Sequence, residues 1–395
     1  MALIDSGVIR SVFPKGDPGS CQWLVVWLLF GVLWFAGFIG LPLGNKIYQQ
    51  GLVLTLWLPA CFAMFYLRKQ IVVLLKEKKL LVGLFVLLFF WEWLAGFIQD
   101  GSSFKDLKRQ FYVLFFIVSV SVLVRFHPTV FLRILYFSAV FSTLIVAVSM
   151  FEFYWLESHS IAVRVSGYGG FSHPILGGYL AGIMVLWLIM PRCSIVLRVA
   201  LASCFVLFII FSQSRGVWLA LAVSLLSLPL VFRRNWAMML PLFSILITVP
   251  LVIYFYEYVI SRGFSYRPEI WFRGLLMVCE QPLWGVGDSY TVVGSSGNVF
   301  DHAHNLMLHI AVVSGLPALV IWLCIWGFVI FYSWQSRDSK LGQLLFLTAI
   351  FSTIAGLFDG AGLWVTPRPE WFLTWLPLAI AIGLRQKMST PQSGF

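Results

Sequence analysis

Long apolar runs separated by short polar segments dominate the chain from end to end. A helix needs about 20 mostly apolar residues to cross a hydrocarbon core of about 30 Å, and runs of this length recur throughout. They predict an all-α polytopic membrane protein that forms a single integral domain over residues 1–395, with no separate soluble domain. The hydropathy pattern predicts about twelve spans, at residues 21–41, 47–67, 80–98, 110–125, 130–151, 174–190, 195–211, 216–232, 236–256, 306–333, 341–358 and 370–384.

One long polar segment, residues 257–303, interrupts this pattern between the ninth and tenth spans. It carries three arginines and ends in a pair of histidines: Arg262, Arg267, Arg273, His302 and His304. Desolvated charge is costly beside a bilayer and tends to mark function. Residues 271–280 are amphipathic and precede Pro282, which predicts a short helix on the membrane surface. We therefore expect residues 257–303 to form a loop that contributes to an active site.

The distribution of basic residues predicts which side of the membrane this loop occupies. The chain is 60% hydrophobic and 11% charged, with a net charge of +11. Of its 27 Lys and Arg residues, 17 fall on the side that would hold both termini and 10 on the other side. The positive-inside rule then places both termini in the cytoplasm and the loop in the periplasm. The net charge thus acts as a topogenic signal that also contacts anionic lipids, and we expect neither a nucleic-acid partner nor a removable signal peptide.

A second polar group, residues 212–216, separates two apolar runs and holds Arg215 close to the membrane boundary. A guanidinium offers five permanent donors, which suit a pair of phosphate oxygens. The alternative is an arginine that anchors a helix end in the interface. Two features favour anion binding: basic residues are disfavoured on this side, and Ser212, Gln213 and Ser214 supply further donors. Arg262 and Arg273 could reach the same anion or serve only at the surface.

The histidine pair is a candidate general base. A neutral imidazole can accept a hydroxyl proton near pH 7, and Asp301 or Asn305 could orient the ring or cap the next helix. Zinc is an alternative, but His304 and His309 are five residues apart and would not share a helical face. We therefore expect no metal and no cofactor. A base that faces an anion clamp suits transfer from a phosphate-linked donor.

These segments resemble the O-antigen ligase family, within a larger group that includes O-antigen polymerases and protein O-oligosaccharyltransferases. The resemblance is carried by residues 212–216 followed by Trp218-Leu219-Ala220, by Arg267 with Trp271 and residues 282–287, by His304-Asn305 with Leu308, Gly315 and Leu316, and by residues 170–179. In related polymerases an asparagine is expected more often at the position of His173, which favours a ligase.

The resemblance implies a glycan on undecaprenyl diphosphate as donor and the outer-core sugar of lipid A-core as acceptor, joined at the periplasmic face of the bacterial inner membrane. It implies that Arg215 and Arg267 hold the diphosphate and that His304 activates the acceptor hydroxyl. It also implies a metal-independent single displacement with inversion. Possible supporting residues are Arg164, His173, Ser214, Arg262, Arg273, Asp301, His302 and Asn305.

Three other functions remain open on the sequence. A polymerase or a protein O-oligosaccharyltransferase would use the same lipid-linked donor. A transporter of lipid-linked glycans, which is not an enzyme, would also need arginines. Many transporters carry inverted repeats, and the long loop has no counterpart of similar length in the first half of this chain, which weakens the transporter hypothesis.

Overall fold

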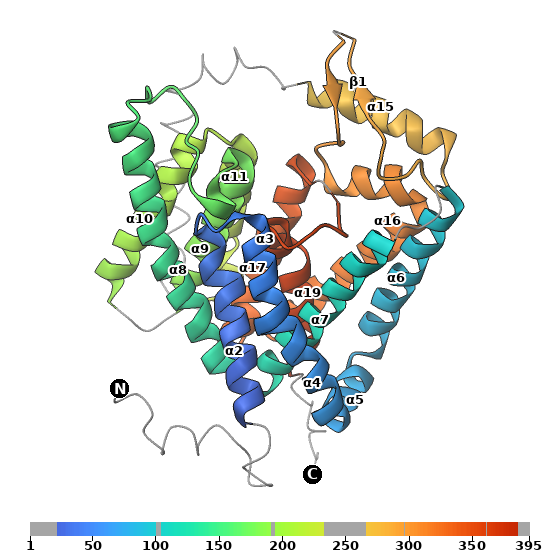
Figure 1. Cartoon of the computed structure of the whole chain (residues 1–395), viewed down its shortest axis with the longest axis horizontal. Coiled ribbons are helices and arrows are strands. Elements are labelled where there is room, and N and C mark those ends of the chain that lie inside the picture. The colour runs from blue at the N-terminus through green and yellow to red at the C-terminus, as the bar shows by residue number, and fades with distance from the viewer. Residues whose placement is uncertain are drawn as a thin grey trace.

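The fold is that of a computed structural model, drawn in Figure 1, which describes residues 22–99, 104–190, 194–232, 266–295, 297–360 and 362–385. The expected ninth span, residues 236–256, and Arg262 lie outside the described residues.

Helices form almost all of the described structure. They are α2 (Gln22–Gly37), α3 (Gly44–Leu52), α4 (Leu58–Tyr66), α5 (Arg68–Glu77), α6 (Lys79–Gln99), α7 (Phe104–Phe126), α8 (Pro128–Phe151), α9 (Pro174–Ile189), α10 (Ile195–Ser212), α11 (Arg215–Leu226), α12 (Leu228–Val231), α15 (Arg267–Glu280), α16 (Leu306–Gln335), α17 (Lys340–Phe358), α18 (Glu370–Leu373) and α19 (Trp375–Gly383). Short 3-10 or π turns add η1 (Phe38–Gly40), η2 (Val53–Trp57), η3 (Glu152–Leu156) and η4 (Gly169–Phe171). A small antiparallel hairpin pairs β1 (Val292–Val293) with β2 (Val299–Phe300).

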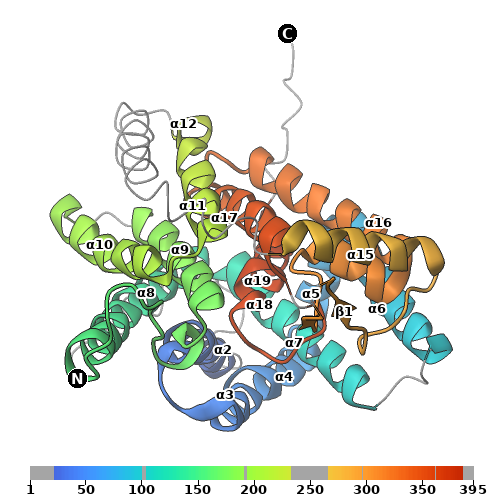
Figure 2. The same cartoon turned by 90° about the horizontal axis from the view of Figure 1, so that it is seen from above.

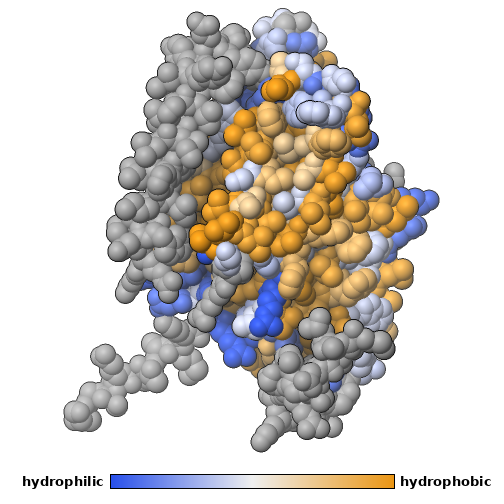
Figure 3. Space-filling view, turned by 90° about the vertical axis from the view of Figure 1, so that its left-hand side faces the viewer, coloured by the Kyte–Doolittle hydropathy of each residue, from blue (hydrophilic) through white to orange (hydrophobic). Residues whose placement is uncertain are grey.

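The helices have the length and apolarity of membrane spans. Within the described ranges, eight helical stretches could cross a bilayer, and residues 174–189 and 215–231 form shorter apolar helices. The face drawn in Figure 3 is mostly hydrophobic between hydrophilic patches near its two ends. An apolar belt of this kind is what lipid contact requires. The all-α polytopic prediction is therefore confirmed, while the expected count of twelve spans stays a prediction.

The most buried helices lie at the centre of the bundle. Seen from above, α18 and α19 are surrounded by α2, α7, α9 and α16 (Figure 2). Every residue of α19 is buried, as are twelve of the residues of α9. A helix that is apolar all round belongs inside such a bundle, because no face needs to meet water. His173, which caps the start of α9, is therefore held by a rigid core.

Helix α16 is broken near its start, where the sequence predicted one continuous span. Gly315 has φ 81° and ψ 173°, and residues 306–314 form a separate short helix. A side chain at this position would overlap with the carbonyl group of Leu283. The part after the break, residues 316–335, can cross a core of about 30 Å by itself, since each residue adds about 1.5 Å. The short helix is thus free to lie at the membrane boundary (Figure 1).

The loop that precedes the hairpin caps this break. The N–H groups of Val286 and Gly287 donate to the carbonyl groups of Val312 and Val313, at 2.8 and 3.2 Å. The N–H of Leu316 donates to Pro282, at 2.8 Å. Backbone groups freed by a helix break must find partners at membrane depth, because no water replaces them. Residues 282–287 therefore fix the short helix.

The end of α6 holds the same break from the other side. The indole N–H of Trp91 donates to the carbonyl of Ser314 at 2.9 Å, and its ring stacks on Trp284 with centroids 5.0 Å apart. The amide of Gln99 donates to the carbonyl groups of both Trp284 and Val313. Together these contacts lock the loop, the break and α6 into one unit.

Candidate active site

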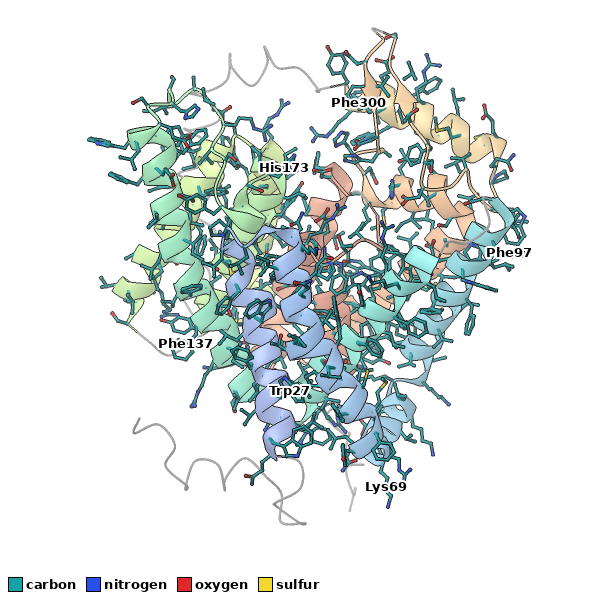
Figure 4. All side chains as sticks on the ribbon, viewed as in Figure 1. Trp27, Lys69, Phe97, Phe137, His173 and Phe300 are labelled. Carbon is teal, nitrogen blue, oxygen red and sulfur yellow. The ribbon has the colours of Figure 1, made fainter. Side chains whose placement is uncertain are left out.

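The predicted site residues gather at one end of the molecule. Figure 4 places His173 and Phe300 at this end and Trp27 and Lys69 at the opposite end. At the opposite end Arg125 forms an ion pair with Glu77, two residues that the charge distribution predicted on one side. The N-terminal cap of α9 and the hairpin thus lie at the end of the molecule opposite to Lys69 (Figure 4).

Helices α9, α11, α15 and α16 all begin at this end, where α17 terminates. The N-terminus of α11 meets the C-terminus of α17 so closely that a Cβ on Gly216 would lie 2.8 Å from Phe358 and from the hydroxyl of Tyr179. The charges of Arg267 and Asp359 both reach the Tyr179 hydroxyl of α9. Helix N-termini carry partial positive charge and unpaired N–H groups, so such a convergence favours an anion.

Asp359, at the end of α17, joins the two histidines. Its Oδ1 lies 3.2 Å from Nδ1 of His304 and 3.2 Å from Nε2 of His302. The same oxygen accepts the N–H of Gly360 at 2.9 Å. An imidazole that donates from Nδ1 keeps its lone pair on Nε2, so this pairing leaves His304 a base with a free acceptor nitrogen.

The local backbone explains how His304 reaches Asp359. His304 has φ 47°, in the left-handed region that non-glycine residues seldom adopt. Asn305 then begins α16, and its Oδ1 accepts the N–H of Leu308 at 3.1 Å. Asn305 is therefore a helix cap. The expected capping role of Asn305 is confirmed. The residue that contacts the His304 ring is Asp359, whereas Asp301 lies 2.7 Å from His302.

Attraction between opposite charges stabilises the cluster of His302, His304 and Asp359. Burial alone would lower the pKa of His302, but hydrogen bonds and charge from Asp359 and Asp301 together raise it. Burial alone would raise the pKa of Asp359, but hydrogen bonds and charge from His302 and His304 hold it well below its usual range. Asp359 is thus ionised near neutral pH, and His302 keeps its proton to a higher pH than a free imidazole does.

The cluster is also the candidate metal site. One ligand atom each from His302, His304 and Asp359 lies within 4.8 Å of the others, a grouping that residue spacing did not predict because Asp359 is distant in sequence. His309 is not part of it: its Nδ1 lies 2.9 Å from the Tyr290 hydroxyl. Both ring nitrogens of His302 face carboxylates. A ring that donates from both nitrogens has no lone pair for a metal, so hydrogen bonding competes with coordination.

Arg215 follows a tight turn that other residues hold in place. Gln213 has φ 51° and ends α10, and its side-chain amide donates to the carbonyl of Ala162 at 3.0 Å. Nε of Arg164 donates to the carbonyl of Ser212 at 2.8 Å. Ser214, which is buried, precedes α11 without capping it through its side chain. Arg164 therefore positions the turn, and Arg215 is the first residue of α11.

Arg267 is the first residue of α15, directly after Tyr266 in the left-handed region with φ 58°. The guanidinium is half-buried, and its Nε is buried without a hydrogen-bond partner among the described residues. A buried donor left unpaired costs free energy, about 1–3 kcal/mol and more for a charged group. Such a donor is suited to a ligand that would satisfy it.

The other candidates have peripheral positions. His173 caps α9 by accepting the N–H of Leu176 at 3.3 Å, and burial lowers its pKa while Asp359 opposes the change. The charges of Arg164, His302 and His304 also reach His173, so it lies beside the cluster. Arg273 is exposed on α15, where its charge acts on Glu269, away from the histidines.

Comparison with known proteins finds similarity to O-antigen ligases. Residues 199–323 match the family model described as O-Antigen ligase. The chain is also 27% identical over 304 residues to a curated O-antigen ligase of Pseudomonas aeruginosa, an alignment that covers 75% of each protein. The chain is thus similar to O-antigen ligases in this segment and over most of its length. This similarity supports a glycosyl-transferring function.

The segment that matches the family model contains Arg215, Arg267 and His304, but Asp359 lies beyond it. Sequence reasoning missed Asp359 as the partner of His304. It also missed Glu370, whose buried Oε1 lies 2.9 Å from Nε of Arg368. The sequence signal for Asp359 was an acid at the end of an apolar span, followed by the glycines of Asp359-Gly360-Ala361-Gly362.

Proposed function

We propose that this protein transfers a polysaccharide from undecaprenyl diphosphate to the outer-core sugar of lipid A-core. The observation that carries the proposal is the pairing of His304 with Asp359, which directs Nδ1 to the carboxylate and leaves Nε2 as the base. Nε2 takes the proton of the acceptor hydroxyl as its oxygen bonds to the anomeric carbon. The bond from that carbon to the diphosphate breaks, and undecaprenyl diphosphate leaves. A single displacement of this kind inverts the anomeric configuration.

The departing diphosphate needs positive charge, and Arg215 and Arg267 supply it. Each is the first residue of a helix, so the helix N-terminus adds partial positive charge beside the guanidinium. Guanidinium groups can neutralise a leaving diphosphate without a metal. The carboxylates on both nitrogens of His302 further support a metal-independent reaction.

We place the reaction at the periplasmic face of the bacterial inner membrane, with both termini in the cytoplasm. The support is that Lys69, from the side richer in basic residues, lies at the opposite end from His173 (Figure 4). A C-terminal alkaline phosphatase fusion should be inactive in cells, whereas a fluorescent protein at the same position should fold. An active phosphatase fusion would reverse the orientation.

Lipopolysaccharide from a deletion strain carrying His304→Gln tests the function. We expect polymer to be absent from lipid A-core while it accumulates on the lipid carrier. His159→Gln is the matched control, because His159 is an exposed histidine outside the cluster and should restore wild-type lipopolysaccharide. A ladder that stops at core plus one repeat unit would indicate a polymerase instead. Glycan lost only from a periplasmic protein would indicate a protein O-oligosaccharyltransferase.

A further inference from the structure

A cavity of about 280 Å³ lies beside the histidine cluster, between α6, α7, the short helix of α16 and the loop after Asp359. Polar and aromatic side chains line it, among them Glu92, Arg109, Gln110, Asp288, His309 and Trp364. From the sequence, five of these six residues have no predicted function, and His309 is a candidate only as a metal ligand. The volume of the cavity lies near the lower limit of pockets for small molecules, about 300–1,000 Å³. The cavity therefore fits one or two sugar units and not a polymer.

The cavity adjoins the proposed active site. Gly362 lines it and also lines the small hollow that contains Asp359. The ring of His309 lies against Gly362, and a Cβ there would be 3.1 Å from its Nε2. The charges of His302 and Asp301 reach the same ring. A ligand in the cavity would therefore lie next to the residues that surround His304.

The side chains suit a ligand rich in hydroxyl groups. Glu92 accepts a hydrogen bond from Ser314, and the indole N–H of Trp364 lies near its carboxylate without reaching hydrogen-bond geometry. Gln110 is only 3% exposed, and its Oε1 has no hydrogen-bond partner within the described part of the chain. Carboxylate and amide oxygens accept from hydroxyls, and an aromatic ring covers the apolar face of a sugar. The lining has two acids, Glu92 and Asp288, and one arginine, Arg109, a balance that disfavours a diphosphate here.

We propose that this cavity holds the sugar of lipid A-core that receives the polymer. The proposal rests on the proposed function, and the position of the arginines separates the two glycans. The charge of Arg267, the first residue of α15, reaches Tyr179 of α9, and Arg215 begins α11, whereas the cavity lies against α6 and α7. The donor glycan therefore enters from the arginines, and the acceptor sugar enters from the cavity.

Steady-state transfer with purified donor and lipid A-core tests this assignment in Glu92→Gln and Asp288→Asn. Both changes keep the side-chain shape, and a glutamine at 92 can still accept from Ser314. We expect KM for lipid A-core to rise about tenfold, the effect of about 1.4 kcal/mol of binding free energy. KM for the donor and kcat at saturating acceptor should stay within about twofold of the wild type. Glu280→Gln, an exposed acid outside the cavity, should leave all three unchanged.

Two results would overturn the proposal. A rise in KM for the donor alone would assign the cavity to the donor sugar. If kcat and both KM values were unchanged in both variants, the cavity would not be a sugar site. Calorimetric titration of the wild type with core oligosaccharide needs no turnover. It therefore separates a failure of the cavity assignment from a failure of the proposed function. We expect Asp288→Asn to bind the oligosaccharide about tenfold more weakly. Equal affinity in wild type and variant would refute the cavity assignment even if transfer occurs.

Discussion

Replacement of Asp359 by asparagine tests the part of the site that sequence reasoning did not find. The carboxylate accepts from Nδ1 of His304, from Nε2 of His302 and from the N–H of Gly360. An asparagine keeps the volume but removes the charge. It can also turn its NH2 group toward His304, which would favour the tautomer with the proton on Nε2. That tautomer cannot accept a proton from the substrate at the nitrogen that needs it.

The fall in the transfer rate follows from the loss of the negative charge at residue 359 and the loss of the correct His304 tautomer. A hydrogen bond to a charged group is worth about 1.5–3 kcal/mol, or roughly 10- to 100-fold in rate. Inversion of the tautomer of a histidine base brings such losses to about 10⁴-fold. We therefore expect kcat of Asp359→Asn to fall between about 10² and 10⁴-fold. KM for the lipid-linked donor should change little, because Arg215 and Arg267 remain.

The assay is transfer by purified protein in detergent, with thermal unfolding measured on the same samples. Asp359 is only 6% exposed, so the unfolding curve identifies a variant that has lost its fold. Glu280→Gln controls for the removal of an acid at an exposed position of the same loop region. A folded Asp359→Asn protein with kcat within about tenfold of the wild type would refute the role of Asp359 in orienting His304.

Three further predictions concern the arginine, the helix break and pH. Arg267→Lys should raise KM for the donor about tenfold or more, because lysine loses the two-pronged contact with phosphate oxygens; an unchanged KM would exclude Arg267 from the donor site. Gly315→Ala should lower the thermal stability by about 1–3 kcal/mol, since φ 81° and the nearby Leu283 carbonyl both oppose a side chain; wild-type unfolding would contradict the helix break. The raised pKa of His302 means that the folded state keeps this proton to a higher pH than the unfolded chain. The wild type should therefore have a larger free energy of unfolding than His302→Gln below about pH 6.5, and this difference should disappear as the pH rises through the pKa of His302 in the folded protein. A difference that grows with pH would contradict the raised pKa.

Local patterns in the sequence predicted the helices and several members of the site. Apolar runs located the spans, and the amphipathic stretch before Pro282 predicted the helix that the structure shows as α15. Asn305 after His304 indicated a helix start, and Asn305 does cap α16. These features depend on neighbouring residues in the chain, so the spacing and composition of the sequence can predict them.

Features that depend on distant contacts were not predictable in this way. Asp359 is 55 residues from His304, and its local sequence, an acid followed by glycines, does not indicate that it contacts a histidine. The break at Gly315 lies inside a continuous apolar run, so hydropathy alone predicts one span. It is stabilised by residues 282–287, Trp91 and Gln99, which satisfy the freed backbone groups.

The most direct test of the central claim is polymer transfer by the purified protein, with an undecaprenyl diphosphate-linked glycan as donor, lipid A-core as acceptor and EDTA throughout. We predict that the wild type forms polymer on lipid A-core under these conditions, with inverted configuration at the new linkage, and that folded His304→Gln forms none above background. Transfer by His304→Gln at the wild-type rate would contradict the assignment of the base. Loss of wild-type activity in EDTA, restored by added zinc, would contradict the metal-independent mechanism.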